Sequence, residues 1–174
     1  MSKLLSKEDV LNSAAKIKNI ILDIDGVLTD GKIYISTENT ETLAFNVRDG
    51  LGIACALKLG IEFWIITGRS SMAVTHRMND LKVKNVYKGV LDKVGKFEEL
   101  LKEGKLTEEN TAYIGDDVID LPLLKRVGLS AAVADGHEEV MENVHWISSK
   151  NGGNTAVREL IDLILAAQGK KIQF

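Results

Sequence analysis

The sequence predicts an α/β fold, built as a doubly wound and mostly parallel sheet with helices on both faces. Short apolar runs without polar alternation are typical of strands that are buried on both faces. Segments of helical periodicity lie between these runs, and repeated strand–helix units favour right-handed crossovers within one sheet. The apolar runs are residues 20–22, 63–66, 111–114 and 129–133.

Two segments show a clear helical period. One carries Val94, Phe97, Leu100 and Leu101, and the other carries Val157, Leu160, Ile161 and Ile164. Asp92 is suited to cap the first of these helices, which places Lys93 in its first turn. A cation there opposes the helix dipole by roughly 0.3–1 kcal/mol, and residues placed against local preference are often site residues. Charges scattered through residues 1–18 predict a short amphipathic surface helix rather than a signal peptide.

Residues 32–47 interrupt the strand–helix pattern. The apolar residues Ile33, Ile35, Leu43 and Phe45 alternate around a polar tip at 36–40. This alternation predicts a β-hairpin that projects just after the first strand. A two-stranded hairpin is at best marginally stable alone and its open edges pair readily. We therefore expect the hairpin to pack against another copy of the chain.

Length and composition suit a single domain that spans residues 1–174 and has no inserted cap domain. The 22 basic and 25 acidic residues give a formal net charge of -3, which argues against a nucleic-acid or membrane partner. No segment approaches the roughly 20 apolar residues that span a bilayer. The single cysteine, Cys55, has no partner for an internal disulfide, so the sequence predicts a cytoplasmic location.

Polar side chains follow three of the predicted strands at the point where each strand ends. They are Asp23 and Asp25 after the first strand, Thr67 and Arg69 after the second, and Asp116, Asp117 and Asp120 after the third. Because ligands of open α/β sheets bind beyond the carboxyl ends of the strands, we expect these side chains to meet there. Carboxylates gathered at buried strand ends need a cation, and Mg²⁺ prefers such oxygen ligands.

Four segments, taken in order, resemble the four motifs of the haloacid dehalogenase superfamily of phosphohydrolases. They are residues 23–30, Thr67-Gly68-Arg69, Lys93 and residues 115–120. Residues 45–50, 133–135, 156–159 and 167–170 extend the resemblance to capless members that act on phosphorylated keto-deoxy sugar acids. The resemblance covers the chain from about Ile17 to Lys170. It implies a magnesium-dependent phosphatase with a place in lipopolysaccharide biosynthesis.

The resemblance implies a role for each catalytic residue. Asp23 is expected to attack phosphorus and form an aspartyl-phosphate, which splits the hydrolysis into two displacements. Asp25 is expected to protonate the departing sugar oxygen and then to deprotonate water. Thr67 and Lys93 are expected to hold the non-bridging phosphate oxygens.

The resemblance also implies the ligands of the metal. Mg²⁺ is expected on the carboxylates of Asp23 and Asp116 and on the backbone carbonyl of Asp25. Asp117 and Asp120 are expected to support these ligands without binding the metal directly. Asp117 would act through a metal-bound water, and Asp120 would orient Lys93 or the metal ligands.

The substrate contacts implied by the resemblance lie in three segments. They are Asn46, Val47, Arg48, Asp49, Gly50, Arg69 and Arg77, beside the catalytic residues Asp25 and Lys93. Arginines suit a substrate with both a phosphate and a carboxylate, and we expect Arg48 in a loop after the hairpin. The expected substrate is 3-deoxy-D-manno-octulosonate 8-phosphate. Many relatives carry a basic residue in place of Ala54, and a basic residue followed by glycine in place of Asn154-Thr155, which leaves a nonulosonate 9-phosphate as the alternative.

Other functions compete with this interpretation. A generalist phosphatase or phosphomutase usually needs a cap, and the spacing from Asp25 to Lys93 leaves no room for one. A non-catalytic magnesium-binding assembly module of the same fold would not need an acid such as Asp25 beside the nucleophile. The resemblance further implies a homotetramer with active sites at subunit interfaces, and residues 169–174 are a candidate lid.

Overall fold

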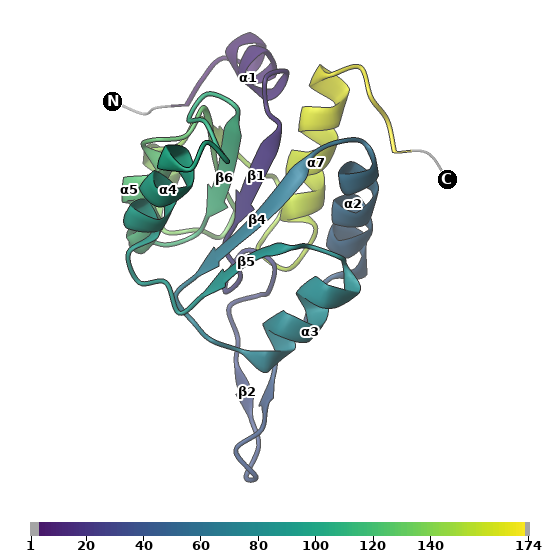
Figure 1. Cartoon of the computed structure of the whole chain (residues 1–174), viewed down its shortest axis with the longest axis vertical. Coiled ribbons are helices and arrows are strands. Elements are labelled where there is room, and N and C mark those ends of the chain that lie inside the picture. The colour runs from purple at the N-terminus through teal and green to yellow at the C-terminus, as the bar shows by residue number, and fades with distance from the viewer. Residues whose placement is uncertain (1–3, 173–174) are drawn as a thin grey trace.

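The computed structural model describes residues 4–172 and confirms the predicted fold class. Its main sheet has six parallel strands in the order β5-β4-β1-β6-β7-β8 (Figure 1). The strands are β1 (Asn19–Leu22), β4 (Glu62–Thr67), β5 (Asn85–Lys88), β6 (Thr111–Gly115), β7 (Leu129–Ala132) and β8 (Trp146–Ile147). The strand order reverses at β1, because β4 and β5 continue to one side and β6 to β8 to the other. Ligands of open sheets bind at such a switch point, beyond the carboxyl ends of the strands.

Helices cover both faces of the sheet, and a separate apolar core fills each side (Figure 1). One core includes residues from α1 (Lys7–Ala14), α2 (Val47–Lys58), α3 (Met72–Asp80) and α7 (Ala156–Ala167). The other includes residues from α4 (Lys93–Lys102), α5 (Leu121–Leu124) and α6 (Glu138–Glu142), and a short 3₁₀ helix, Val118–Asp120, leads into α5.

All four predicted strands are present, and two further strands at the sheet edges were missed. Both edge strands have only half-buried residues, so they lack the unbroken apolar run that marks the central strands. The predicted helices around Val94 and Val157 are α4 and α7. The predicted surface helix is α1, which is shorter than the charged segment and begins after the cap Ser6.

The predicted hairpin projects from the end of the molecule where the sheet strands terminate (Figure 1). It pairs β2 (Tyr34–Ile35) with β3 (Glu41–Thr42) around a turn at 36–40, so its strands are shorter than expected. The hydroxyl oxygen of Ser36 accepts backbone N–H groups from the turn.

The predicted apolar alternation does not produce one exposed apolar face. Ile33 and Ile35 are 41% and 70% exposed, whereas Leu43 and Phe45 pack against the chain's own core. The predicted limit at residue 47 also overlaps a helix. Asn46 caps α2 by accepting an N–H two residues on, so the hairpin segment ends before it.

The chain after α7 turns back over the opposite end of the sheet. The side chain of Gln168 donates to the carbonyl of Ile17, which precedes β1, and Lys170 Nζ donates to the carbonyl of Leu59 at 3.0 Å. The predicted tail begins here, and its last two residues, 173 and 174, lie outside the described part. A lid over a neighbouring site therefore stays a prediction. Among residues 4–172, no helix is long and apolar enough to cross a bilayer.

Candidate active site

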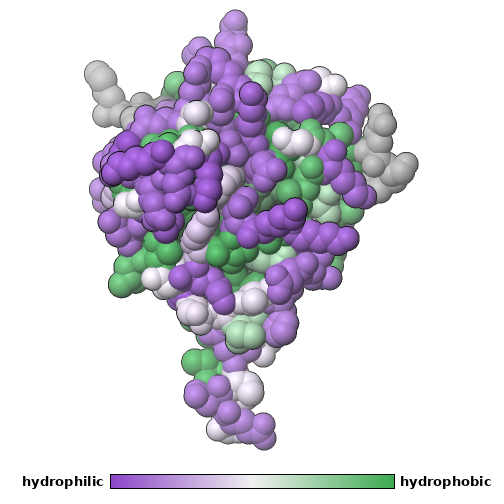
Figure 2. All heavy atoms as spheres, viewed as in Figure 1, coloured by the Kyte–Doolittle hydropathy of each residue, from purple (hydrophilic) through white to green (hydrophobic). Residues whose placement is uncertain are grey.

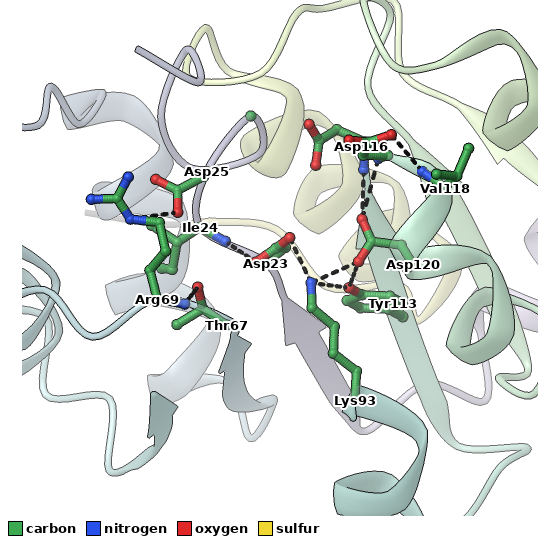
Figure 3. A network of polar contacts seen from close by, with 12 residues as sticks. Asp23, Ile24, Asp25, Thr67, Arg69, Lys93, Tyr113, Asp116, Val118 and Asp120 are labelled. Atoms are coloured by element: carbon green, nitrogen blue, oxygen red, sulfur yellow. Dashed lines mark hydrogen bonds and ion pairs between the residues drawn. The ribbon is translucent and has the colours of Figure 1, made fainter. Parts of the chain in front are cut away.

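Asp23 follows β1 directly and faces Lys93, the first residue of α4 (Figure 3). Lys93 Nζ donates to Asp23 Oδ2 at 2.6 Å, and the backbone N–H of Ile24 donates to Oδ1 at 2.7 Å. The predicted cap of α4 is present, since Asp92 accepts the N–H of Gly95 at 2.9 Å. The helix therefore begins at the point that brings a buried ammonium to the end of β1.

Asp120 binds the same ammonium from the other side. Lys93 Nζ donates to Asp120 Oδ1 at 2.7 Å and to the Tyr113 hydroxyl at 3.1 Å. That hydroxyl donates in turn to Asp120 Oδ1. Asp120 Oδ2 accepts the backbone N–H groups of Asp116 at 3.0 Å and of Asp117 at 3.3 Å. Both oxygens of this buried carboxylate are used, so it fixes the lysine and the loop after β6.

Burial raises the pKa of two carboxyl groups in this cluster. The pKa of Asp116 rises to about 7, first through burial and then through the nearby carboxylates of Asp120 and Asp23. Burial likewise raises the pKa of Asp23 to about 6, against the opposing effect of Lys93. Burial alone would lower the pKa of Lys93, but its two carboxylate partners outweigh this effect and raise it.

The three carboxylates at the strand ends fit a magnesium ion. Oxygens of Asp23, Asp116 and Asp120 lie within 4.8 Å of one another, with one ammonium beside them. Such a group is short of positive charge, and its hard oxygen atoms are the ligands that Mg²⁺ prefers. Gly26 has φ +80°, and a Cβ there would collide with the Asp116 carboxylate. This glycine therefore lets Asp116 approach the loop after β1.

The side chain of Asp25 lies apart from the carboxylate cluster and beside Arg69 (Figure 3). Its Oδ2 is 3.5 Å from Arg69 Nε, and its buried Oδ1 has no hydrogen-bond partner within residues 4–172. Burial raises the pKa of Asp25, Glu41 adds to this effect, and Arg69 opposes it. A carboxyl group with a raised pKa and a free oxygen suits general acid catalysis. Its predicted backbone contact to the metal stays a prediction.

Thr67 ends β4, which neighbours β1. The strand register pairs Leu22 with Ile65, so Thr67 lies level with the chain just past Asp23. Its buried hydroxyl oxygen accepts the N–H of Arg69 at 3.4 Å. The structure thus brings the second predicted motif to the same edge of the sheet as the first.

The segment predicted to contact the sugar acid begins α2. Arg48 lies in the first turn of this helix, so the expectation that it sits in a loop is wrong. The cap Asn46 accepts the N–H of Arg48 at 2.8 Å and thereby starts the helix directly after the hairpin. Val47 and Arg48 are exposed there, while Gly50 is buried.

Asp49 and Arg77 make structural contacts. The buried Asp49 carboxylate accepts the N–H of Thr155 at 3.2 Å and of Arg158 at 2.7 Å, so it anchors the start of α7. Arg77 pairs with Asp80 at 3.1 Å on α3, and its guanidinium packs where a Cβ of Gly50 would stand. Their predicted substrate contacts stay predictions, like those of the rest of this segment.

The site also contains three residues that the sequence did not predict: Tyr113, Glu41 and Ser71. Tyr113 had an available signal, because a tyrosine in a buried strand needs a partner for its hydroxyl. Glu41 and Ser71 contact each other across the hairpin and α3, and Glu41 also pairs with Arg69. No local pattern in the sequence indicates a contact between those two elements.

The arrangement suits phosphoryl transfer. It joins a buried carboxylate and a fixed ammonium to a second carboxyl group that is free at one oxygen. Carboxylate oxygens for a divalent cation lie at the same strand ends. With the doubly wound sheet, these features define a haloacid dehalogenase-type phosphohydrolase. The family of haloacid dehalogenase-like hydrolases matches residues 85–161.

Similar proteins of known name identify the family within this class of phosphohydrolases. The chain is 47% identical over 162 residues to 3-deoxy-D-manno-octulosonate 8-phosphate phosphatase of Escherichia coli K12, covering 93% of this chain and 86% of that one. The structure of the Yersinia pestis phosphatase of this name matches with a TM-score of 0.91 at 45% identity, covering 94% of this chain and 88% of that one. This chain belongs to the family of 3-deoxy-D-manno-octulosonate 8-phosphate phosphatases.

A third relative carries ligands. The Moraxella catarrhalis phosphatase, solved with a magnesium ion, a phosphate ion and a KDO molecule, matches with a TM-score of 0.91. It is 39% identical, and the match covers 94% of each chain.

Proposed function

We propose that this chain hydrolyses 3-deoxy-D-manno-octulosonate 8-phosphate to the sugar acid and inorganic phosphate. The observation that carries this proposal is the contact of Lys93 with Asp23 at 2.6 Å, inside a site that also contains Asp25. Relatives that are 47% identical to this chain over 162 residues bear the name of this activity. The same site residues argue against a non-catalytic assembly module, which needs neither the nucleophile nor the acid.

In the first displacement, an oxygen of Asp23 attacks phosphorus while the bond to the sugar oxygen breaks. Two donors orient the attacking carboxylate: Lys93 Nζ on Oδ2 and the N–H of Ile24 on Oδ1. A fixed carboxylate avoids part of the entropy cost of bringing the reacting atoms together. The product of this step is a phosphoryl group on Asp23.

Asp25 handles the proton of both displacements. In its protonated form it gives a proton to the departing sugar oxygen. The resulting carboxylate then accepts a proton from the water that attacks phosphorus, while the bond between phosphorus and the Asp23 oxygen breaks and inorganic phosphate leaves. The unpartnered Oδ1 leaves this side chain an oxygen for that exchange. Arg69 holds the other oxygen, Oδ2, from a distance of 3.5 Å.

Thr67 and Lys93 hold the non-bridging oxygens of the phosphoryl group. The ammonium is fixed beside the site by two carboxylates and the Tyr113 hydroxyl, and it exchanges one of these three hydrogen bonds for a phosphate oxygen when the substrate binds. Asp23 and Asp116 would hold Mg²⁺, and Asp120 would keep Lys93 and the loop of Asp116 in place. The bound ion supplies positive charge that neutralises the phosphate oxygens.

A panel of phosphate esters tests this proposal. Phosphate release is measured with Mg²⁺ for 3-deoxy-D-manno-octulosonate 8-phosphate, a nonulosonate 9-phosphate, hexose phosphates and an aryl phosphate, with a chelator as control. We expect the eight-carbon sugar acid to give the highest kcat/KM, and the chelator to abolish release. A preference for the nonulosonate ester would favour the alternative substrate, and equal rates for hexose phosphates would overturn the sugar-acid assignment.

We further propose that the chain forms a closed homotetramer with active sites at subunit interfaces. Large apolar side chains are exposed on the hairpin and around the site. They are Ile33, Tyr34, Ile35, Val47, Leu51, Met72 and Leu91. Figure 2 shows the hairpin standing clear of the body, with apolar side chains near its root. Apolar groups in this number around one projecting element favour burial against other copies.

We also place the protein in the cytoplasm. Its single cysteine cannot form an internal disulfide, and its substrate is a charged, water-soluble phosphate ester.

A further inference from the structure

Glu41 connects the projecting hairpin to the active site. It begins β3, and its Oε2 accepts a hydrogen bond from Arg69 Nη2. Its Oε1 accepts a hydrogen bond from Ser71 Oγ at 2.5 Å. The two donors lie on the segment between β4 and α3. Both oxygens of the Glu41 carboxylate are therefore held by the edge of the site.

The side chain of Ser71 bonds to Glu41 and does not cap its own helix. It stands at the N-cap of α3, where a serine usually accepts a helix N–H, but its side chain makes no cap hydrogen bond. The residue is only 4% exposed, so its hydroxyl is shielded from water. The hydroxyl donates instead to Glu41. Ser71 therefore holds Oε1 of the Glu41 carboxylate, while Arg69 holds Oε2.

The Arg69 guanidinium is held at two of its three nitrogens. Nη2 donates to Glu41, and Nε lies 3.5 Å from Asp25 Oδ2. Nη1 donates to no side chain or carbonyl in the described part of the chain, which leaves its two N–H groups open. A guanidinium held in this way presents one free edge to an anion and loses little further rotational freedom on binding it.

We propose that Glu41 is a positioning residue that holds Arg69 so that its free edge receives the carboxylate of the substrate. This inference rests on the proposed function. Selection for a sugar acid then requires the hairpin, because a phosphate ester without a carboxylate makes no ion pair with the free N–H groups of the oriented arginine. Without Glu41, Arg69 keeps its charge and loses its fixed direction.

Glu41→Gln tests this role, and Glu38→Gln is the matched control. Glu38 lies on the exposed turn of the same hairpin, and the Arg69 side chain contacts Glu41 and Asp25 but not Glu38, so the variant removes the same charge without removing a contact of Arg69. kcat and KM are measured for 3-deoxy-D-manno-octulosonate 8-phosphate and for an aryl phosphate. In Glu41→Gln we expect KM for the sugar acid to rise about tenfold more than KM for the aryl ester, with kcat changing much less. Glu38→Gln should match the wild type.

A double-mutant cycle separates positioning from a structural effect. If Glu41 acts through Arg69, Glu41→Gln causes no further loss of selectivity in an Arg69→Ala background. Ser71→Ala removes one tether of Glu41 from outside the hairpin and should shift selectivity in the same direction by a smaller factor. If Glu41→Gln changes the mass of the assembly in light scattering, the substrate selectivity of Ser71→Ala becomes the test of the positioning role.

Three results would overturn the inference. One is wild-type selectivity in both Glu41→Gln and Ser71→Ala, and another is an equal loss for the two substrates. The third is full additivity with Arg69→Ala. In each case the wild-type preference for the sugar acid still stands, so the proposed function survives. A wild type without that preference removes both the proposed function and the inference.

Discussion

Lys93 Nζ lies 2.6 Å from Asp23 Oδ2 and 2.7 Å from Asp120 Oδ1, so one buried ammonium bridges the ends of β1 and β6. The position of Lys93 in the first turn of α4 is unfavourable for the helix dipole. The two carboxylates compensate, because they raise the pKa of the lysine against the effect of burial. The cost in helix stability therefore yields a charged donor at the Asp23 carboxylate.

Replacing Asp25 with Asn should slow turnover by about 10²–10⁴-fold, because the amide cannot donate and accept the proton. The loss should be smaller for an aryl phosphate in the first displacement, since its leaving group needs little protonation. Single-turnover kinetics with both substrates measure this difference. Wild-type rates with the sugar ester would contradict the role of Asp25.

Gly26→Ala should weaken magnesium binding, because the added Cβ collides with the Asp116 carboxylate. Gly60→Ala is the matched control, since Gly60 has φ +85° and an added Cβ there meets nothing within 4 Å. Both variants should lose about 1–2 kcal/mol of stability from the left-handed backbone. Titration calorimetry should show at least a tenfold weaker magnesium affinity for Gly26→Ala alone. Equal affinities in the two variants would refute this account of the glycine.

Without magnesium, the protein should become less stable as pH rises from about 5 to about 8. The pKa values of Asp116 and Asp23 are raised to about 7 and about 6 by burial, so the folded state binds more protons than the unfolded state in this range. Stability is then lost as these groups ionise. Thermal unfolding in a chelator measures the trend.

Magnesium should reverse this trend, because it binds the ionised carboxylates and gains affinity as pH rises. Asp116→Asn should flatten the dependence of Tm on pH in the chelator. A Tm that rises with pH in the metal-free protein would contradict the assigned pKa directions.

Ile35→Asp should break the assembly, because Ile35 is 70% exposed on the hairpin and is proposed to be buried between subunits. Thr37→Asp places the same charge on the polar turn and should leave the assembly intact. Light scattering should give about four times 19.1 kDa for the wild type and a smaller mass for Ile35→Asp. A wild-type mass near that of one chain would refute the tetramer.

The central strands and the site could be predicted because of where they lie. Strands buried on both faces leave unbroken apolar runs, and parallel strands deliver the residues after them to one edge. This is why Asp23, Thr67 and Asp116 could be grouped from the amino-acid sequence alone. Edge strands such as Asn85–Lys88 are half-buried and carry no such signal.

Contacts between distant elements could not be predicted. The pair of Glu41 and Arg69 depends on how far the hairpin leans toward α3, and no local pattern encodes that angle. The error at Arg48 has a local cause. The apolar alternation ends at Phe45, and Asn46, a preferred helix cap, already starts α2 inside the segment predicted as hairpin.

The central claim is that Asp23 carries the phosphoryl group during turnover. The most direct measurement is rapid quenching of Asp25→Asn with magnesium and an aryl phosphate, whose leaving group needs little protonation, followed by mass spectrometry of the intact chain and its peptides. We expect one added phosphoryl group on Asp23, labile to hydroxylamine and absent from the Asp23→Asn variant. A phosphoryl group on another residue, or Asp23→Asn with wild-type turnover, would contradict the account.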